Sequence, residues 1–257
     1  MVVTQEGASA DVALNRPQTK NALDGVTITL LADVLAALAS DSAVRVVVLR
    51  GADDTFCSGD DLREAGTADR SAFLSQIEGL QEVTRRLRAM PQPVIASIAG
   101  HALGGGLELA LACDLRIAAA DAQLGCPEAS WGLTITNGAS RLLAEAVGET
   151  RARELVLLGY RIDAVTAERY GLVSKVVPAE TLRAATQQWA DRLLQASPMA
   201  LCLNKRLLAG AEERLERALR NEVDSVMCAY DSVDGQEGLR AFRERREPTF
   251  ARDPRGL

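Results

Sequence analysis

Short runs of apolar, often β-branched residues recur through the first two thirds of the chain, separated by polar turns and by longer amphipathic stretches. Runs of this length and composition are typical of buried strands. They predict strands at 11–14, 45–49, 94–98, 114–118 and 172–177.

Between the predicted strands, apolar residues return at helical spacing. This pattern predicts a helix from Asn21 to about Ser40 and another from Ser71 to Met90, which Pro91 ends. Beyond about residue 178 the strand pattern stops, and the rest of the chain predicts helices alone. Their apolar faces have no sheet of their own to cover, so we expect them to pack on the preceding core or on another subunit.

Composition narrows the class of protein. The chain has 257 residues, 47% of them hydrophobic and 25% charged, as in an ordinary globular protein. A formal net charge of −6 argues against a nucleic-acid surface. Its five cysteines form no CxxC pair and no secretory segment is evident, which favours reduced thiols and a cytoplasmic protein. No apolar run approaches the ~20 residues that a membrane span requires.

Candidate chemistry centres on Gly104–Gly106, which lies between the predicted strand 94–98 and a helix-forming stretch, 107–112. Glycines at a helix start let a ligand approach unpaired N–H groups, and Glu108 would lie beside them. A second turn of this kind is Ser58-Gly59-Asp60. The alternative is structural: a tight turn with Glu108 in solvent, and Asp60 or Asp61 as a helix cap.

Other reaction classes lack their motifs. The sequence contains neither HExxH, nor GxSxG, nor a Walker GxxxxGK[ST], and His101 is its one histidine. We therefore expect no metal site. A single histidine beside a glycine turn is more often structural than catalytic, so we expect a structural role for His101. What remains is two N–H donors, at Asp60 and Gly105, and two carboxylates, Glu108 and Glu128. That combination suits chemistry through an enolate.

Several longer motifs occur in a recognisable order along nearly the whole chain: Leu14-Asn-Arg-Pro, Thr55-Phe-Cys-Ser-Gly-Asp-Asp-Leu62, Ala99-Gly-His-Ala-Leu-Gly-Gly-Gly-Leu-Glu-Leu-Ala110, Leu124-Gly-Cys-Pro-Glu128 and Ala167-Glu-Arg-Tyr-Gly-Leu-Val173. In these motifs the chain resembles the enoyl-CoA hydratase/isomerase (crotonase) superfamily. The resemblance implies an α/β fold, a spiral of ββα turns over residues 1–195 that holds the acyl-CoA site. It also implies a helical module over 196–257 for packing and oligomerisation, as a homotrimer or homohexamer.

The resemblance assigns roles by position. The backbone N–H groups of Asp60 and Gly105 would form the oxyanion hole. Glu108 and Glu128 would be the two acids of a hydratase, which adds water syn across a 2-enoyl-CoA. We expect Glu108 to be the base and Glu128 the acid. Coenzyme A is then part of the substrate, and no separate cofactor, nucleic acid or membrane is expected.

Further positions are implied less directly. Ser58, Asp60, Arg63 and Arg245 match CoA-binding positions, while Trp131 and Ile135 would line the acyl pocket. Three departures from the family pattern stand out. Asp60 replaces a common alanine, Ile135 stands where many members have proline, and Leu107 replaces a frequent cysteine.

Two alternatives stay open at this point. A sister activity, double-bond isomerisation or the C–C cleavage of a feruloyl-CoA-type hydratase-lyase, uses the same oxyanion hole. Trp131-Gly132 resembles the lyase pattern, which however lacks a glutamate at position 108. A non-enzymatic member that binds RNA or a protein partner is the other alternative, and the acidic net charge speaks against RNA.

Overall fold

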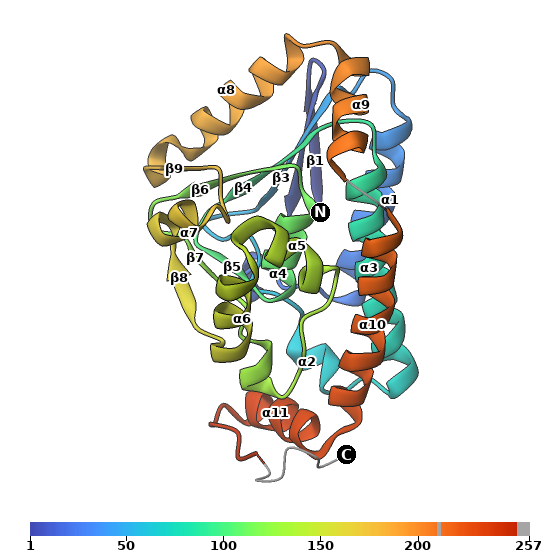
Figure 1. Cartoon of the computed structure of the whole chain (residues 1–257), viewed down its shortest axis with the longest axis vertical. Coiled ribbons are helices and arrows are strands. Elements are labelled where there is room, and N and C mark those ends of the chain that lie inside the picture. Colours follow the sequence, from blue (N-terminus) through green and yellow to red (C-terminus); the bar gives the residue numbers. More distant parts are fainter. Residues whose placement is uncertain (210–211, 251–257) are drawn as a thin grey trace.

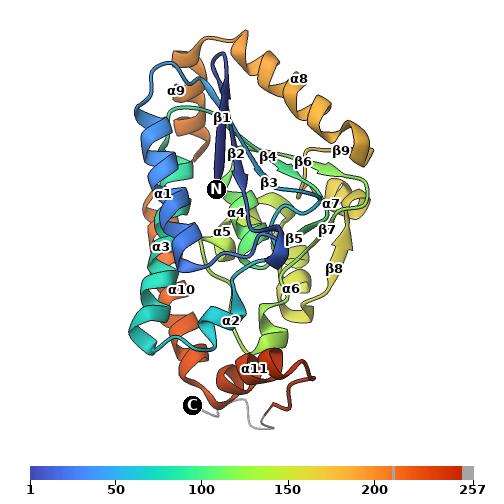
Figure 2. The ribbon, with the colours of Figure 1, turned by 180° about the vertical axis from the view of Figure 1, so that it is seen from behind.

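The larger of two sheets has six strands in the order β1-β2-β3-β4-β6-β9 (Figures 1 and 2). The computed structural model describes residues 1–209 and 212–250. The strands are β1 (Val2–Glu6), β2 (Ser9–Leu14), β3 (Val46–Gly51), β4 (Val94–Ile98), β6 (Leu115–Ala119) and β9 (Lys175–Val177). All neighbours from β2 to β9 pair in parallel, and only β1 runs antiparallel to its neighbour.

A smaller sheet has the strand order β5-β7-β8. Along the chain, β5 directly follows β4 of the larger sheet, and β7 directly follows β6. Its strands are β5 (His101–Leu103), β7 (Gln123–Gly125) and β8 (Arg161–Asp163). Cys57 extends it through a parallel bridge to Ala102. The chain thus passes repeatedly from a strand of the large sheet to a strand of the small one and then to a helix. This is the predicted spiral of ββα turns.

In chain order, the helices are α1 (Gly25–Ser40), α2 (Leu62–Ala65), α3 (Arg70–Ala89), α4 (Gly105–Ala112), α5 (Ala139–Val147), α6 (Glu149–Leu158), α7 (Ala164–Tyr170), α8 (Leu182–Leu194), α9 (Pro198–Ala209), α10 (Glu212–Asp231) and α11 (Val233–Glu244). Three short 3-10 helices are η1 (Pro17–Thr19), η2 (Glu128–Trp131) and η3 (Ala179–Thr181).

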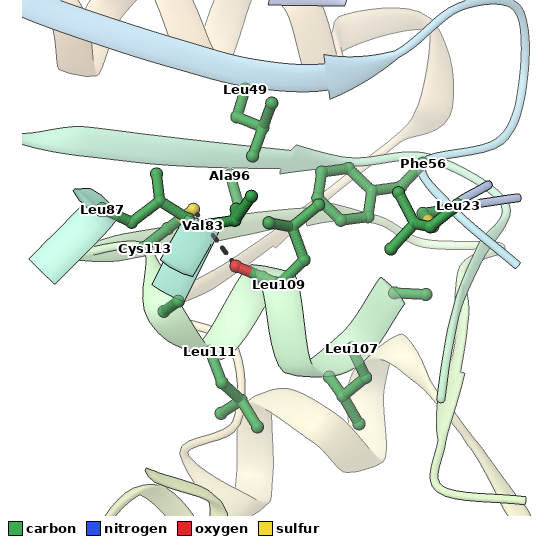
Figure 3. Close-up of a cluster of buried hydrophobic side chains, with 14 of the residues drawn as sticks. Leu23, Leu49, Phe56, Val83, Leu87, Ala96, Leu107, Leu109, Leu111 and Cys113 are labelled. Carbon is green, nitrogen blue, oxygen red and sulfur yellow. Dashed lines mark hydrogen bonds between the residues drawn. The ribbon is translucent and has the colours of Figure 1, made fainter. Parts of the chain in front are cut away.

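Alternate residues of the parallel strands supply two separate cores. Val47 and Leu49 of β3 point into the main core with α1, α3 and α4, whereas Val46 and Val48 pack on the opposite face with α8. Because both faces of the sheet are covered here, residues 46–49 of β3 are apolar at every position rather than at alternate ones. Figure 3 shows the main core where Leu109 of α4 points toward the sheet and α3, while Leu107 and Leu111 project from the opposite side of the helix. The burial of α4 on all sides fixes the position of the turn that precedes it.

The elements follow the sequence pattern with local differences. The helix expected from Asn21 begins at Gly25, because the side chain of Asp24 accepts a hydrogen bond from the N–H of Thr27 and caps it there. The strand expected over 172–177 begins at Lys175. Strands β1, β5, β7 and β8 were not predicted, and β5, β7 and β8 have only three residues each.

The last three helices return to the core. Helix α10 packs along α3, and α11 contacts α2 and η2 (Figure 1). The α/β class is confirmed. The division at 195/196 stays a prediction, and residues 210–211 and 251–257 of its second part lie outside the described residues.

Candidate active site

The glycine turn between β5 and α4 has a backbone conformation and close contacts that leave no room for a larger side chain. Gly104 has φ +52°, in the left-handed region, and a Cβ on Gly106 would lie 2.4 Å from the carbonyl oxygen of Cys57. Gly104 is the N-cap of α4 and offers no side-chain acceptor. Gly105 is the first residue of the helix, so its N–H has no intrahelical partner and is free for a ligand.

A second turn, residues 57–61, leaves another N–H free. The Leu23 N–H donates to Gly59 O, and the Asp61 N–H donates to Leu23 O, at 2.9 Å each. In such a parallel bridge the residue between the two partners faces the other way. The N–H of Asp60 therefore points away from Leu23, and it donates to no acceptor within the described residues.

These two turns meet. A Cβ on Gly59 would lie 3.5 Å from the nitrogen of Gly105 and 2.8 Å from Leu103 O, and a Cβ on Gly105 would lie 2.6 Å from Asp60 Oδ1. Both turns line one cavity of about 410 Å³. The free N–H groups of Asp60 and Gly105 thus come from turns in direct contact, as two donors to a single oxygen would require.

Apolar side chains and a few charged groups make up the rest of this cavity. Leu62, Phe73, Leu103, Trp131, Leu133 and Phe242 are among its apolar lining residues. Lys20, Arg63 and Arg161 also line it, so three cations accompany the acids. A cavity that is apolar in one part and cationic in another suits an acyl group attached to a phosphate-bearing carrier.

Glu108 lies inside the protein on α4, with 1% of its surface exposed. Its Oε1 accepts a hydrogen bond from the N–H of Thr136 at 2.7 Å. Its Oε2 accepts from the Thr136 hydroxyl and from Asn137 Nδ2, at 2.8 Å each. Burial raises the pKa of Glu108 well above its usual value, as do the nearby Glu128 and Asp60 carboxyls, while the Thr136 N–H opposes the rise. The solvent-exposed alternative for Glu108 is excluded.

Glu128 begins η2 and lines the cavity, whereas Glu108 is separated from it by Thr136, a lining residue to which it is hydrogen-bonded. Both of its carboxyl oxygens are buried without a hydrogen-bond partner, and Oε1 would lie 3.4 Å from a Cβ on Gly104. Burial raises the pKa of Glu128 to about 8, and the Asp60 carboxyl contributes to the rise. At neutral pH this side chain is therefore mostly a neutral acid with a proton to give.

The carboxyl of Asp60 is a third acid in the cavity. Its Oδ1 is buried without a partner, and burial raises the pKa of Asp60 to about 6. Its neighbour Asp61 is bound differently: it caps α2 by accepting from the Arg63 N–H and pairs with Arg16 at 3.0 Å. The two adjacent aspartates thus occupy opposite surroundings, one unpaired at the cavity and the other fixed in an ion pair.

The remaining predicted positions are partly brought together. Ser58 lines the cavity, and its hydroxyl donates to Thr19 O at 3.1 Å. Arg63 lies exposed at the cavity and also lines an adjoining surface hollow with Arg245, the C-cap of α11. Trp131 lines both and packs edge to face on Phe242, with ring centroids 5.1 Å apart.

Ile135 lines a second cavity, of about 830 Å³, with residues of α5, α6 and α10. Glu128, Leu133 and Thr134 line both cavities, so this second cavity adjoins the first at the acid. The assignment of Trp131 and Ile135 to an acyl pocket stays a prediction.

Several residues of the site escaped the sequence reasoning. Thr136 and Asn137, which hold Glu108, lie 28 and 29 residues after it, and Lys20 and Arg161 come from separate turns. One signal was available for Asn137. Asn137-Gly138 is a turn pair, and Asn137 has φ +54°, which asparagine tolerates better than most residues.

His101 also lines the cavity. Burial lowers its pKa, as do the charges of Lys20 and Arg161. Within residues 1–209 and 212–250, no three His, Cys, Asp or Glu side chains are placed to hold a metal ion. None of the described helices is long and apolar enough to cross a membrane.

Comparison with known proteins gives a consistent pattern. A family model described as "Enoyl-CoA hydratase/isomerase" matches residues 4–253. The chain is 35% identical over 254 residues to a crotonyl-CoA hydratase of Syntrophomonas wolfei, with 97% of both chains covered. It is 34% identical over 251 residues to the 2,3-dehydroadipyl-CoA hydratase of Escherichia coli, covering 97% of this chain and 98% of that one. Among solved structures, an enoyl-CoA hydratase from Mycobacterium avium subsp. paratuberculosis superposes with a TM-score of 0.89 at 34% identity, covering 97% and 98%.

Proposed function

The chain belongs to the enoyl-CoA hydratase/isomerase family, and we propose that it is a hydratase that adds water reversibly to a 2-enoyl-CoA thioester. The observation that carries this proposal is a pair of buried glutamates next to two free N–H groups. Glu128 lines the cavity, and Glu108 lies directly behind Thr136, a lining residue that donates two hydrogen bonds to it. The pKa of each glutamate is raised, chiefly by burial. Hydration needs one group that accepts a proton and another that donates one.

The thioester oxygen would accept hydrogen bonds from the N–H groups of Asp60 and Gly105. As water adds to Cβ, the π electrons of the C=C bond move toward that oxygen and an enolate forms. Donors placed to meet such a charge contribute on the order of 3–4 kcal/mol each in a dry site. Because both N–H groups belong to turns fixed by other hydrogen bonds, little reorganisation is needed when the charge develops.

The two glutamates divide the proton transfers. Burial and the neighbouring acids raise the pKa of Glu108, so it is a stronger base than an exposed glutamate once it is ionised. The three donors to its carboxyl oppose that rise and support the ionised form, and its Oε1, which accepts only from the Thr136 N–H, keeps a lone pair for water. Glu108 takes the proton of the water whose oxygen bonds to Cβ. Glu128, whose raised pKa keeps it protonated at neutral pH, gives its proton to Cα. The proton that Glu108 has taken then passes to Glu128, directly or through solvent, which restores both side chains, and the sum is one water added across the double bond.

The rest of the assignment extends the proposal. Ser58, Asp60 and Arg63 would contact CoA, together with Lys20 and Arg161, which line the same cavity. Arg245, on the adjoining hollow, would meet CoA phosphates there. Coenzyme A arrives as part of the substrate and no resident cofactor is required. We also propose a homotrimer or homohexamer acting in the cytoplasm.

The decisive experiment follows loss of the conjugated thioester absorbance when the purified protein meets crotonyl-CoA, with mass analysis of the product. A product heavier by one water supports a hydratase. An unchanged mass would indicate an isomerase, and a shortened acyl group a lyase. Absence of turnover on enoyl-CoA thioesters of several chain lengths, with normal binding of butyryl-CoA, would refute the proposal.

A further inference from the structure

The carboxyl of Asp60 lies beside Gly105, which carries one of the free N–H groups, and it forms no hydrogen bond with Glu108 or Glu128. A Cβ on Gly105 would be 2.6 Å from its Oδ1, 3.2 Å from its Cγ and 3.3 Å from its Oδ2. The carboxyl group therefore rests against the residue that carries the second N–H donor, and it lines the cavity with its Oδ1 unpartnered. Whatever oxygen enters between the two N–H groups comes close to this carboxyl.

The surroundings of Asp60 do not stabilise its ionised form. The acids facing it are Glu108 from α4 and Glu128 from η2, and the buried Cys57 thiol lies in its own turn. The cations of the cavity, Lys20 from η1, Arg63 from α2 and Arg161 from β8, form no ion pair with it, and His101 from β5 has a lowered pKa. Arg16 pairs with Asp24 and Asp61 instead. A carboxylate in this position would repel the enolate oxygen.

Protonation removes the repulsion and supplies a donor. We propose that Asp60, as a neutral carboxylic acid, donates a third hydrogen bond to the thioester oxygen and to the enolate that forms from it. The proton stays on Asp60 throughout, so the balance of the reaction does not change. A neutral acid that donates to an enolate is physically sound in an apolar site, where burial disfavours ionisation. This inference rests on the proposed hydratase function, but its test does not depend on turnover alone.

The proposal predicts a pH dependence that Asp60 itself sets. On the alkaline side, activity would fall as the pH rises through the raised pKa of Asp60, before Glu128 ionises, whereas the acidic side is set by ionisation of the base Glu108. Asp60→Asn keeps a neutral donor at the same place but has no proton to lose. Its kcat/KM at low pH would therefore stay within a few-fold of the unsubstituted enzyme and would not fall in the first alkaline step. Asp60→Ala lacks the donor, and we expect about a 10- to 100-fold lower kcat at pH 5.5, as for loss of a hydrogen bond to a charged group.

A spectroscopic experiment separates this proposal from the hydratase assignment. Butyryl-CoA, ¹³C-labelled at the thioester carbonyl, cannot be hydrated, and its C=O stretching frequency falls with each hydrogen bond to the oxygen. We expect the bound frequency in the unsubstituted protein to rise between pH 5 and pH 8. It should stay low in Asp60→Asn and high in Asp60→Ala at every pH. Asp61→Asn, at the ion-paired neighbour, should keep the pH dependence of the unsubstituted protein.

The carbonyl frequencies and the hydration assay test the role of Asp60 and the hydratase assignment separately. Equal carbonyl frequencies in the unsubstituted protein and Asp60→Ala at pH 5, with butyryl-CoA bound to both, would overturn the role of Asp60 even if hydration is fast. The expected frequencies without hydration of any enoyl-CoA would leave Asp60 as the third donor and refute the hydratase instead. A circular dichroism spectrum of each variant checks that the fold is kept.

Discussion

The two glutamates of the cavity have the same side chain in opposite surroundings. Glu108 is on α4, a helix buried along its whole length, and accepts three hydrogen bonds from the 136–137 segment. Glu128 begins the short turn η2 and has no partner on either oxygen. Donors favour the charged form and burial without donors favours the neutral one. The comparison explains how one cavity can hold a base and an acid at the same pH.

Removing either carboxyl tests that division most strongly. We expect Glu108→Gln and Glu128→Gln each to lower kcat for crotonyl-CoA hydration by about 10²- to 10⁴-fold, the usual contribution of a general acid or base. The affinity for butyryl-CoA should change little, because neither carboxyl is needed to bind the CoA portion. Activity retained in one of the two variants would show that a single acid performs both proton transfers.

Stability should separate the same two variants. Glu108→Gln places an amide NH2 among groups that donate to Glu108, so we expect a loss of about 1–3 kcal/mol in the free energy of unfolding. Glu128→Gln loses no hydrogen bond. The folded-state pKa of Glu128 is raised to about 8, so its contribution is most favourable below the unfolded value and is lost as the pH rises toward 8.

Urea unfolding between pH 5 and pH 8 measures both effects. The unsubstituted protein should lose stability relative to Glu128→Gln as the pH rises, at up to about 1.4 kcal/mol per pH unit for one proton. A constant difference between the two across this range would contradict the unpaired, neutral state of Glu128.

How much of this site the sequence predicts depends on how far apart along the chain the interacting residues lie. Strand 94–98 and the glycine turn follow from local pattern, because apolar runs and glycines at a helix start have local causes. The burial of Glu108 stayed open in the sequence, since nothing local separates a buried from an exposed glutamate at that place. The partners of Glu108 do not follow from local pattern, since Thr136 reaches it across 28 residues. The cavity that Ile135 lines does not follow from local pattern either, because the side to which a loop residue points is set by the backbone around it rather than by its own type.

Changing the donors of Glu108 should alter its pKa in a known direction. Thr136→Val removes the hydroxyl that donates to Oε2 and keeps the backbone N–H. The ionised form loses support, so the acidic limb of the kcat profile should move to higher pH and the maximum rate should fall about tenfold. Thr134→Val is the matched control, because the Thr134 hydroxyl is buried without a partner. An unshifted acidic limb in Thr136→Val would show that the hydroxyl does not act on the ionised carboxyl.

The smallest effect is expected from Glu222, a positioning residue behind Glu108. From α10, its Oε2 accepts from the Gly138 N–H at 2.6 Å and its Oε1 from the Ser140 N–H at 2.9 Å, which fixes the segment that carries Thr136 and Asn137. Its charge also contributes to the raised pKa of Glu108. Glu222→Gln removes that charge but keeps one acceptor, so the acidic limb should move to lower pH by a few tenths of a unit, opposite to Thr136→Val, while kcat falls only a few-fold.

The pH profiles of these variants, read with that of Glu216→Gln on the same helix, decide the matter. Glu216 pairs with Arg85 on the surface, so its profile should match that of the unsubstituted protein. If Glu222→Gln and Thr136→Val shift the limb in the same direction, Glu222 acts only by holding the segment in place. Opposite shifts would show that helix α10 acts on Glu108 through the charge of Glu222 as well as by holding the segment in place.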